Sequence, residues 1–350
     1  IIVVIISVLL FVRNRATNIF QIVVGIFLSS TGASRRVINT FNHMGLCVSY
    51  DTVQRCLLSL SESSKKHANA FVRTASRLWA VVYDNINFTL RKASQRLDST
   101  TEQLNATTSA IISLPSTFTR AAYATALSVA ERNRSAGKRS LLSLKDLILT
   151  PNKQTQLQNA LRHQVRMILL DHAPGLLRRT KRNRKLRKRA MALKPEIRVL
   201  SHEKTEFYPL PALAQEEASV SGTIKVIVKL FTKLLALAEE VVASELRLLV
   251  GDWLTIRNLR LVKDEVAEDL TAFTRMDWIQ EVSMPFHFQL NAMYMLFRTH
   301  LGHPADNDPS SLEHHRTLLK RCKLDPKKPE YNKAKELLYH SLIARVLDCA

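Results

Sequence analysis

Two aspartates in this chain follow short apolar segments of the kind that form buried strands. Asp84 comes directly after residues 78–83, and Asp252 comes after residues 246–250 and a glycine. A strand held in a core fixes the backbone, while the residue at its carboxyl end projects from the sheet. Carboxylates on neighbouring strands suit Mg²⁺ or Mn²⁺ and the two-metal chemistry of phosphoryl transfer. We therefore predict that Asp84 and Asp252 are catalytic residues and ligands of a divalent cation.

Both aspartates also have an ordinary structural interpretation. Asp84 precedes Asn85, and this pair is favourable in a tight turn because both side chains can bond nearby backbone groups. Asp252 follows Gly251 and could cap a helix or occupy a turn. For each residue alone the two interpretations are comparable, and only the presence of two strand-end aspartates favours the metal site.

A second candidate site is a basic run in which nine of the twelve residues from 178 to 189 are Lys or Arg. The run has no acidic residue to offset its repulsion, so a merely structural surface helix is the least favoured interpretation. It predicts either a nuclear import signal, read by an import receptor, or a strip that binds nucleic-acid phosphates. Its basic residues are Arg178, Arg179, Lys181, Arg182, Arg184, Lys185, Arg187, Lys188 and Arg189.

The overall charge points to the same class of partner. Lys and Arg number 51 against 30 Asp and Glu, giving a net charge of +21 at pH 7. Removing the nine residues of the basic run still leaves 21 − 9 = +12. A field of this sign attracts polyanions, so we expect DNA as a partner and the nucleus as the location. The four cysteines show no Cys-x-x-Cys spacing, which fits a reducing compartment and argues against a zinc knuckle.

The apolar segment 1–12 is shorter than the roughly 20 residues that a membrane-spanning helix needs. We expect a buried core helix there and no membrane partner, with a truncated signal anchor as the alternative. Helical spacing continues over residues 18–64, with helices predicted at 34–44 and from Ser49, a good N-cap, onwards. Gly45 between them is a plausible helix stop. Residues 1–75 are thus predicted to form a helical unit whose outline matches a helix-turn-helix.

The rest of the chain predicts a mixed α+β domain over residues 76–350. Strands are expected at 78–83, 88–92 and 108–114, followed by a mostly helical stretch from 119 to 193 that contains the basic run. Then come a strand-like segment at 197–208, a turn at 209–211, a helix at 223–244, strands at 246–250 and 278–288, and a helix at 290–300. The helical and basic part, about 116–220, is expected to be an insertion before the first core helix.

This order of strands, helices and aspartates resembles a ribonuclease-H-like fold. Four stretches are also similar to an uncharacterised fungal family, a domain of unknown function derived from transposable elements. They are residues 83–88 (YDNINF), 250–255 (VGDWLT), 285–289 (PFHFQ) and 327–331 (KKPEY), and the helical segment 20–60 resembles the region before that domain. The expected fold is therefore a helical N-terminal unit followed by a ribonuclease-H-like mixed sheet with a large helical insertion.

The resemblance implies a transposase-like protein that binds DNA and cleaves and joins phosphodiester bonds with Mg²⁺ or Mn²⁺. Asp84 and Asp252 would then be two members of an acidic triad whose third member lies on a helix after Phe288. The expected helix 290–300 contains no Asp or Glu, which leaves Glu313, Glu330 and Glu336 as candidates. Because the sequence opens without Met, we expect it to be a fragment. We also expect it to be truncated at the C-terminus, so that the third acid could lie after Ala350. The alternative is a catalytically inactive DNA- or chromatin-binding protein with the same fold.

Overall fold

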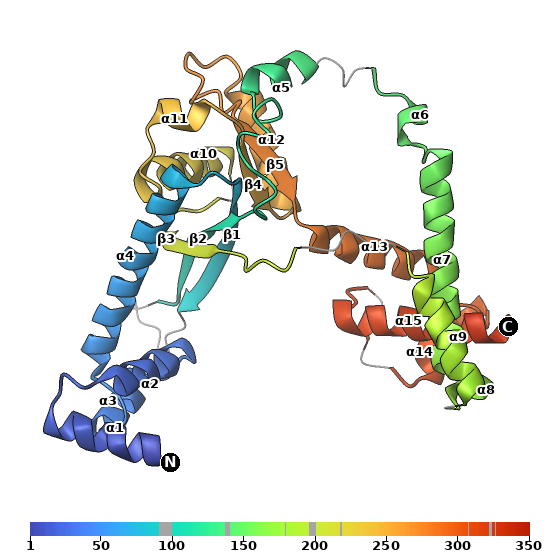
Figure 1. Cartoon of the computed structure of the whole chain (residues 1–350), viewed down its shortest axis with the longest axis horizontal. Helices are drawn as coiled ribbons and strands as arrows, with labels where there is room; N and C mark the ends of the chain where they lie inside the picture. Colours follow the sequence, from blue (N-terminus) through green and yellow to red (C-terminus); the bar gives the residue numbers. More distant parts are fainter. Residues whose placement is uncertain are drawn as a thin grey trace. The chain divides into compact units, whose positions relative to one another are not determined.

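The protein is a mixed α+β protein with a five-stranded mixed sheet, as the sequence predicts at this coarse level. The computed structural model describes residues 1–90, 100–136, 141–178, 180–195, 201–217, 219–306, 308–321, 324–325 and 327–350 (Figure 1). Two compact units are present, and each consists of two separate segments of the chain. Unit 1 contains Ile1–Glu131 and Glu203–Val282, and unit 2 contains Arg132–His202 and Ser283–Ala350. The N-terminal helical segment therefore belongs to the same unit as the sheet.

Four helices open the chain: α1 (Ile2–Arg13), α2 (Ile19–Ser30), α3 (Arg35–His43) and α4 (Tyr50–Thr74). The predicted caps are confirmed, because the Ser49 hydroxyl accepts a hydrogen bond from the backbone amide of Thr52 at 3.3 Å. Gly45 adopts φ 74°, a left-handed conformation that ends α3 without the strain a side chain would add. A small apolar core of this segment includes Ile38 and Val53.

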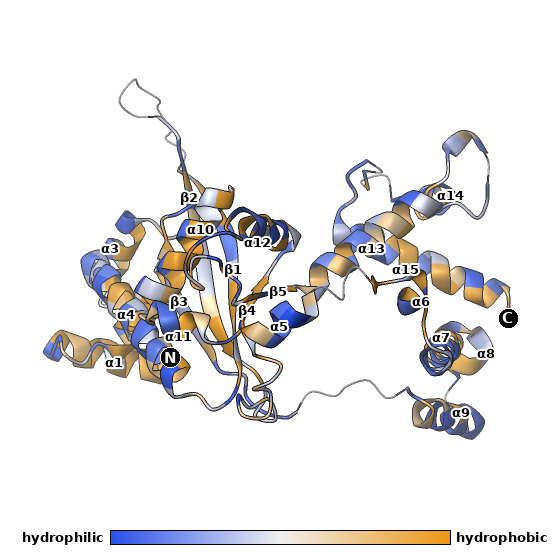
Figure 2. Cartoon of the chain, turned by 90° about the horizontal axis from the view of Figure 1, so that it is seen from above, coloured by the Kyte–Doolittle hydropathy of each residue, from blue (hydrophilic) through white to orange (hydrophobic). Residues whose placement is uncertain are grey.

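Helix α1 is the first departure from expectation. Its residues other than Ser7 and Arg13 are apolar, and Figure 2 colours it mainly as hydrophobic. Only Phe11 is buried in it, whereas Val3 is 71% exposed and Leu9 is 64% exposed. The predicted burial of this segment is therefore wrong. In the part of the chain that the structure describes, no helix combines the length and the apolar character needed to cross a bilayer.

The sheet has the strand order β3-β2-β1-β4-β5. Its strands are β1 (Trp79–Leu90), β2 (Glu102–Ser113), β3 (Phe207–Leu213), β4 (Arg247–Gly251) and β5 (Ile279–Ser283). β1 is antiparallel to β2 along its whole length, and β2 is antiparallel to β3. β4 is parallel to β1, with Val82 opposite Val250 as the last registered pair. β1 therefore lies at the centre of the sheet and extends well beyond the end of β4.

Two local predictions about the strands are wrong. Residues 84–87 do not turn but continue in register with β2, so the expected strand at 78–83 and residues 88–90 of the next one form a single strand, and residues 91–92 lie outside the described residues. The expected turn at 209–211 is part of β3, where Pro209 lies opposite Ala110. Proline is tolerated there because β3 is an edge strand that does not need every backbone donor. The helical stretch and the basic run consequently lie between β2 and β3.

One predicted helix and one predicted strand near the sheet also differ from the structure. The expected helix at 223–244 is divided into α10 (Val220–Val228), the π-helix η2 (Lys229–Leu234) and α11 (Glu239–Ala243). Ala236, with φ 49°, lies in the break between η2 and α11. The expected strand at 278–288 ends at Ser283, because Pro285 starts helix α13 and has no backbone N–H for a sheet.

The core of unit 1 lies between the sheet and the helices that follow β3 and β4. Tyr83 and Leu249 from the sheet share this core with Phe231 of η2 and with Ile256 of α12 (Trp253–Glu265). Helix α10 packs against α12, and α4 packs against β3. The burial of apolar side chains from these elements joins α4, the sheet and the helices α10, η2 and α12 into one core.

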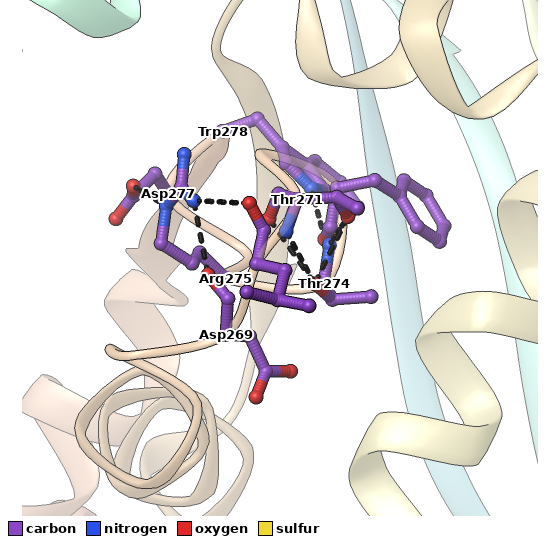
Figure 3. Close-up of polar contacts among 8 residues, drawn as sticks. Asp269, Thr271, Thr274, Arg275, Asp277 and Trp278 are labelled. Carbon is purple, nitrogen blue, oxygen red and sulfur yellow. Dashed lines mark hydrogen bonds and ion pairs between the residues drawn. The ribbon is translucent and has the colours of Figure 1, made fainter.

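A loop between α12 and β5 anchors the far end of the sheet (Figure 3). The fully buried Trp278 donates its indole N–H to the carbonyl of Phe273 at 3.0 Å. The Arg275 guanidinium donates to the Asp269 carbonyl at 3.0 Å and pairs with Asp277 at 3.3 Å. The Trp278 carbonyl in turn accepts from the backbone amide of Arg247 at 2.7 Å, which ties the loop to β4.

Unit 2 is helical. Its elements are most of α5 (Val129–Ala136), then α6 (Leu144–Leu147), α7 (Pro151–His172), α8 (Pro174–Leu177), α9 (Lys181–Ala192), α13 (Pro285–His300), the short 3₁₀ helix Pro304–Asp306, α14 (Leu312–Leu318) and α15 (Tyr331–Asp348). Helix α7 packs against α8, α9 and α15, so segments from both parts of the chain meet within the unit. A core that includes Met293, Phe297 and Leu337 holds the C-terminal helices together.

Candidate functional site

The two predicted aspartates belong to adjacent strands of the sheet. The last registered pair of these strands is Val82 of β1 with Val250 of β4, and each aspartate comes two residues after its strand's member of that pair. The backbones of neighbouring strands in a sheet lie about 4.8 Å apart, so the backbones of β1 and β4 are close together where the two strands pair. β4 ends at Gly251, so Asp252 is the first residue beyond it, whereas Asp84 lies within β1.

Asp252 has the helix-capping role that the sequence offered as an alternative. One of its carboxylate oxygens accepts a hydrogen bond from the backbone amide of Thr255 at 2.7 Å, at the start of α12. Gly251 makes this strand-to-helix corner possible, because a Cβ atom there would lie 2.3 Å from the Thr255 methyl group. The capping interpretation is confirmed, and the second carboxylate oxygen is not used by this cap.

Asp84 does not occupy a turn. Its side chain is exposed, one carboxylate oxygen accepts from the amide of Asn85 at 2.9 Å, and its carbonyl accepts from the Thr108 hydroxyl at 3.2 Å. Successive side chains of a strand point to opposite faces of the sheet. The Cβ atom of Asp84 therefore lies on the face opposite to the one that buries Tyr83.

A third carboxyl group, which the sequence reasoning missed, is Glu217 in the connection between β3 and α10. Its side chain is fully buried, with 0% exposure. The Glu217 carbonyl accepts hydrogen bonds from the Thr223 hydroxyl at 3.0 Å and from the Asn258 amide at 3.2 Å. Gly222 allows the chain to fold this tightly, since a Cβ there would lie 2.3 Å from the carbonyl oxygen of Glu216. The backbone of Glu217 is therefore held by both α10 and α12.

The charges of both aspartates act on Glu217. Burial, and then repulsion by Asp252 and Asp84, raise the pKa of Glu217 from 4.5 to about 7, while neighbouring groups of Thr255 and Tyr83 lower it by less. The hydroxyl groups of Thr255 and Tyr83 therefore lie near the Glu217 carboxyl group, but neither meets the distance and angle of a well-formed hydrogen bond with it, and no described cation pairs with it. Burial and the nearby Glu217 and Asp252 carboxylates also raise the pKa of Tyr83. The site thus holds three carboxyl groups and no neutralising partner for the buried one.

This arrangement can do two things chemically. A carboxyl group with a pKa near 7 is populated in both protonation states at neutral pH and can donate or accept a proton. Together with Asp84 and Asp252 it forms a set of hard oxygen donors of the type that Mg²⁺ and Mn²⁺ prefer. In the described ranges no three Asp, Glu, His or Cys side chains stand at ligand distance as they are. Ion binding would therefore require at least one of these side chains to move.

The three third-acid candidates from the sequence are engaged elsewhere, in unit 2. Glu313 pairs with Arg316 at 2.6 Å, Glu330 pairs with Lys333 at 2.5 Å, and Glu336 pairs with Arg321 at 2.9 Å. Glu217 precedes Phe288, whereas the resemblance to the ribonuclease-H-like fold places the third acid after it. The sequence feature that could have identified Glu217 is its place between a strand and a helix N-cap. That cap is Ser219, whose hydroxyl group accepts a hydrogen bond from the backbone amide of Gly222 at 3.0 Å at the start of α10.

The basic run forms helix α9 and the segment just before it, except that Arg179 lies outside the described residues. Arg187 pairs with Asp171 of α7 at 2.6 Å, so one member of the run has an acidic partner from another helix. Arg178 and the other basic residues of α9 are exposed.

Comparison with curated proteins and with solved structures finds no match for this chain. A family model, described as a family of unknown function (DUF6589), matches residues 136–350. The matched region contains Glu217, Asp252 and the basic run, whereas Asp84 and the strands β1 and β2 precede it. The match bears out the expected domain of unknown function and carries no information on a fungal or transposon origin. Because it covers more than half of the chain, this protein belongs to the DUF6589 family.

Proposed function

We propose that this protein binds DNA and cleaves phosphodiester bonds in a reaction that depends on Mg²⁺ or Mn²⁺ held by Asp84, Glu217 and Asp252. The observation that carries the proposal is the buried carboxyl group of Glu217, which has no cationic partner among the described residues and is repelled by the charges of both aspartates. A buried carboxylate without a partner is costly to a fold, and a cation is the simplest group that offsets the cost. Glu217 replaces Glu313, Glu330 and Glu336 as the proposed third acid.

The arrangement of the sheet supports the same proposal. The order β3-β2-β1-β4-β5, with β1 antiparallel to β2 and parallel to β4, is the order of a ribonuclease-H-like sheet. In that interpretation Asp84 and Asp252 come from the two central strands, and Glu217 comes from the start of the crossover helix between them. The expected transposase-like activity, with strand transfer after cleavage, and the nuclear location are part of this proposal.

Each residue has a distinct role in the proposed site. Asp252 is fixed by its cap on Thr255 and offers its second oxygen, while Asp84 is exposed and offers the most freely placed carboxylate. Glu217 is held by its backbone bonds to Thr223 and Asn258 and can move a proton near neutral pH. A bound divalent cation would supply the positive charge that stabilises the phosphoryl oxygens and the leaving oxygen.

A nicking assay tests the proposal. Supercoiled DNA is incubated with the full chain and Mg²⁺ or Mn²⁺, and the variants Asp84→Asn, Glu217→Gln and Asp252→Asn are compared with the parent protein. Asp252→Asn is informative because Asn is also a good N-cap, so the variant removes the charge and keeps the helix start. Asp264→Asn, an exposed position on the same helix α12, is the matched control. We expect each site variant to lose at least tenfold in rate and the control to lose nothing; equal activity in all four variants would refute the site.

A catalytically inactive DNA- or chromatin-binding protein is the second candidate. The observation that favours it is that Asp84, Glu217 and Asp252 do not stand at ligand distance within the described part of the chain. On this alternative the parent protein binds DNA and does not nick it with either cation. Isothermal titration of the protein with Mn²⁺ separates the two candidates further, because the active site requires saturable binding that Glu217→Gln weakens.

A further inference from the structure

Helix α9 is a docked helix and not a free basic tail. The buried Asn183 places its side-chain amide within hydrogen-bonding distance of three carbonyl oxygens, those of Gly175 and Leu176 at 3.2 Å and that of Arg178 at 2.7 Å. The Thr180 hydroxyl caps α9 by accepting from the backbone amide of Asn183 at 3.1 Å. These contacts fasten the start of α9 to α8.

The same face of α9 is held along its length. Four residues after Asn183, the Arg187 guanidinium pairs with Asp171 at 2.6 Å and also donates to the Leu170 carbonyl of α7. Three residues further, Ala190 is buried. A spacing of four and three residues keeps all three side chains on one side of a helix. One face of α9 is therefore committed to unit 2.

The opposite face carries only positive charge. Six residues of α9 are exposed there and have no carboxylate partner in the described part of unit 2: Lys181, Arg182, Arg184, Lys185, Lys188 and Arg189. At 100° per residue these six side chains fall in a continuous arc of about 160°, centred opposite the docked face. Fixing like charges in one arc is unfavourable in the absence of a polyanion, which points to an anionic partner.

The dimensions of this face fit the backbone of duplex DNA. Residues 181 to 189 span about 12 Å of helix, a length over which duplex DNA carries about seven negative charges, close to the six positive charges of the face. A helix with its side chains is about 10–12 Å wide, and the major groove of B-DNA is about 12 Å wide. The deep, narrow major groove of an RNA duplex does not admit a helix in this way.

A hollow beside the start of α9 adds a place for one phosphate group. It has a volume of about 510 Å³ and is lined by Arg178, Arg184 and Arg187 together with Asn183, Leu176 and Leu177. Arginine is suited to bidentate contacts with a phosphate group. The exposed face itself carries no Asn or Gln that would read adenine, so its contacts are with the backbone and do not depend strongly on sequence.

We propose that α9 is a rigid helix that binds the phosphate backbone of duplex DNA, oriented by its docked face on α7 and α8. The proposal deepens the DNA-binding part of the proposed function and does not depend on Asp84, Glu217 or Asp252. An import receptor that reads an extended segment would require α9 to undock, with loss of the Asn183 and Arg187 contacts.

The test measures the salt dependence of binding. A labelled 30-base-pair duplex is titrated with the full chain in EDTA, and fluorescence anisotropy gives the dissociation constant at several salt concentrations. The triple variant Lys181→Gln, Lys185→Gln, Lys188→Gln removes three charges from the exposed face. The control variant Lys153→Gln, Arg162→Gln, Arg166→Gln removes three exposed charges from α7. We expect the logarithmic salt slope to fall by up to about 2.7 in the first variant, from about 0.9 per phosphate contact, and to stay unchanged in the control.

A second variant tests the docking and keeps every positive charge. Asn183→Ala removes the amide that fastens α9 to α8, so we expect weaker binding, a smaller salt slope and faster trypsin cleavage within residues 181–189. Equal loss of slope in the α9 and α7 triple variants would overturn the proposal in favour of diffuse charge. Unchanged DNA binding, with loss of nuclear accumulation of the tagged α9 triple variant, would overturn it in favour of an import receptor. Because this titration is done in EDTA, it measures binding without metal-dependent cleavage. A protein that binds DNA here and does not nick it in the separate assay with Mg²⁺ or Mn²⁺ counts against the carboxylate site alone.

Discussion

Replacing Glu217 with glutamine should make unit 1 more stable at high pH and leave its stability unchanged at low pH. Burial and the two aspartates raise the pKa of Glu217 from 4.5 to about 7. The folded state therefore holds this proton more tightly than the unfolded state, so the contribution of the group is fully present below pH 4.5 and is lost as pH rises through 7. Glutamine resembles the protonated acid in shape and cannot ionise, so the variant keeps that contribution at every pH.

The magnitude follows from the size of the pKa change. The difference between about 7 and 4.5 is about 2.5 pH units, and each unit corresponds to about 1.4 kcal/mol. The upper limit is therefore about 3.5 kcal/mol, and relaxation and water penetration at the site reduce the observed value. We expect Glu217→Gln to match the parent protein at pH 4.5 and to exceed its free energy of unfolding by about 1–3 kcal/mol at pH 8.

The chain offers a direct assay for this prediction. Its three tryptophans, Trp79, Trp253 and Trp278, all belong to unit 1, so their fluorescence during urea unfolding follows that unit. The matched control is Glu216→Gln, because Glu216 is the exposed neighbour and should show no pH-dependent difference. A difference between Glu217→Gln and the parent that is the same at pH 4.5 and pH 8 would refute the electrostatic reasoning, whatever its size.

Three further changes test the elements that hold the site. Trp278→Ala should lower the free energy of unfolding of unit 1 by about 3–5 kcal/mol, measured by circular dichroism in urea, because a fully buried ring leaves a cavity. Gly222→Ala should cost about 1–3 kcal/mol and weaken Mn²⁺ binding in calorimetry, because the new methyl group displaces the Glu216 carbonyl. Asp252→Ala should cost about 1 kcal/mol through loss of its cap on Thr255, whereas Asp252→Asn should cost nearly nothing in the same unfolding experiment.

The elements with a strong local signal were predictable. The caps of the N-terminal helices and the strand that ends before Asp252 follow from hydroxyl groups and apolar runs that act within a few residues. The single strand β1 was not predictable, because Asp84 to Asn87 look like a turn and only pairing with β2 keeps them extended. The π-helix after Val228 likewise depends on core packing that no local pattern records.

The candidate site was predictable in part for the same reason. Asp84 and Asp252 stand out because each directly follows an apolar run, and the register of β1 and β4 decides that they are neighbours. Glu217 has no such run immediately before it, and its importance comes from long-range contacts with Asn258 and from the charges of the two aspartates. Those relations exist only once the helices have packed.

The interleaving of the two units has a consequence for how the chain is made. The backbone passes between them at residues 131/132, 202/203 and 282/283, so three covalent connections join them. During synthesis the segment 132–202 leaves the ribosome long before its partner segment 283–350 exists, and β1 and β2 must likewise wait for β3, β4 and β5. Both units are thus completed late, and a chaperone that shields the exposed apolar faces of the early segments has a defined interval in which to act. After folding, a protease that cuts one of the three connections leaves the two units still joined by the others.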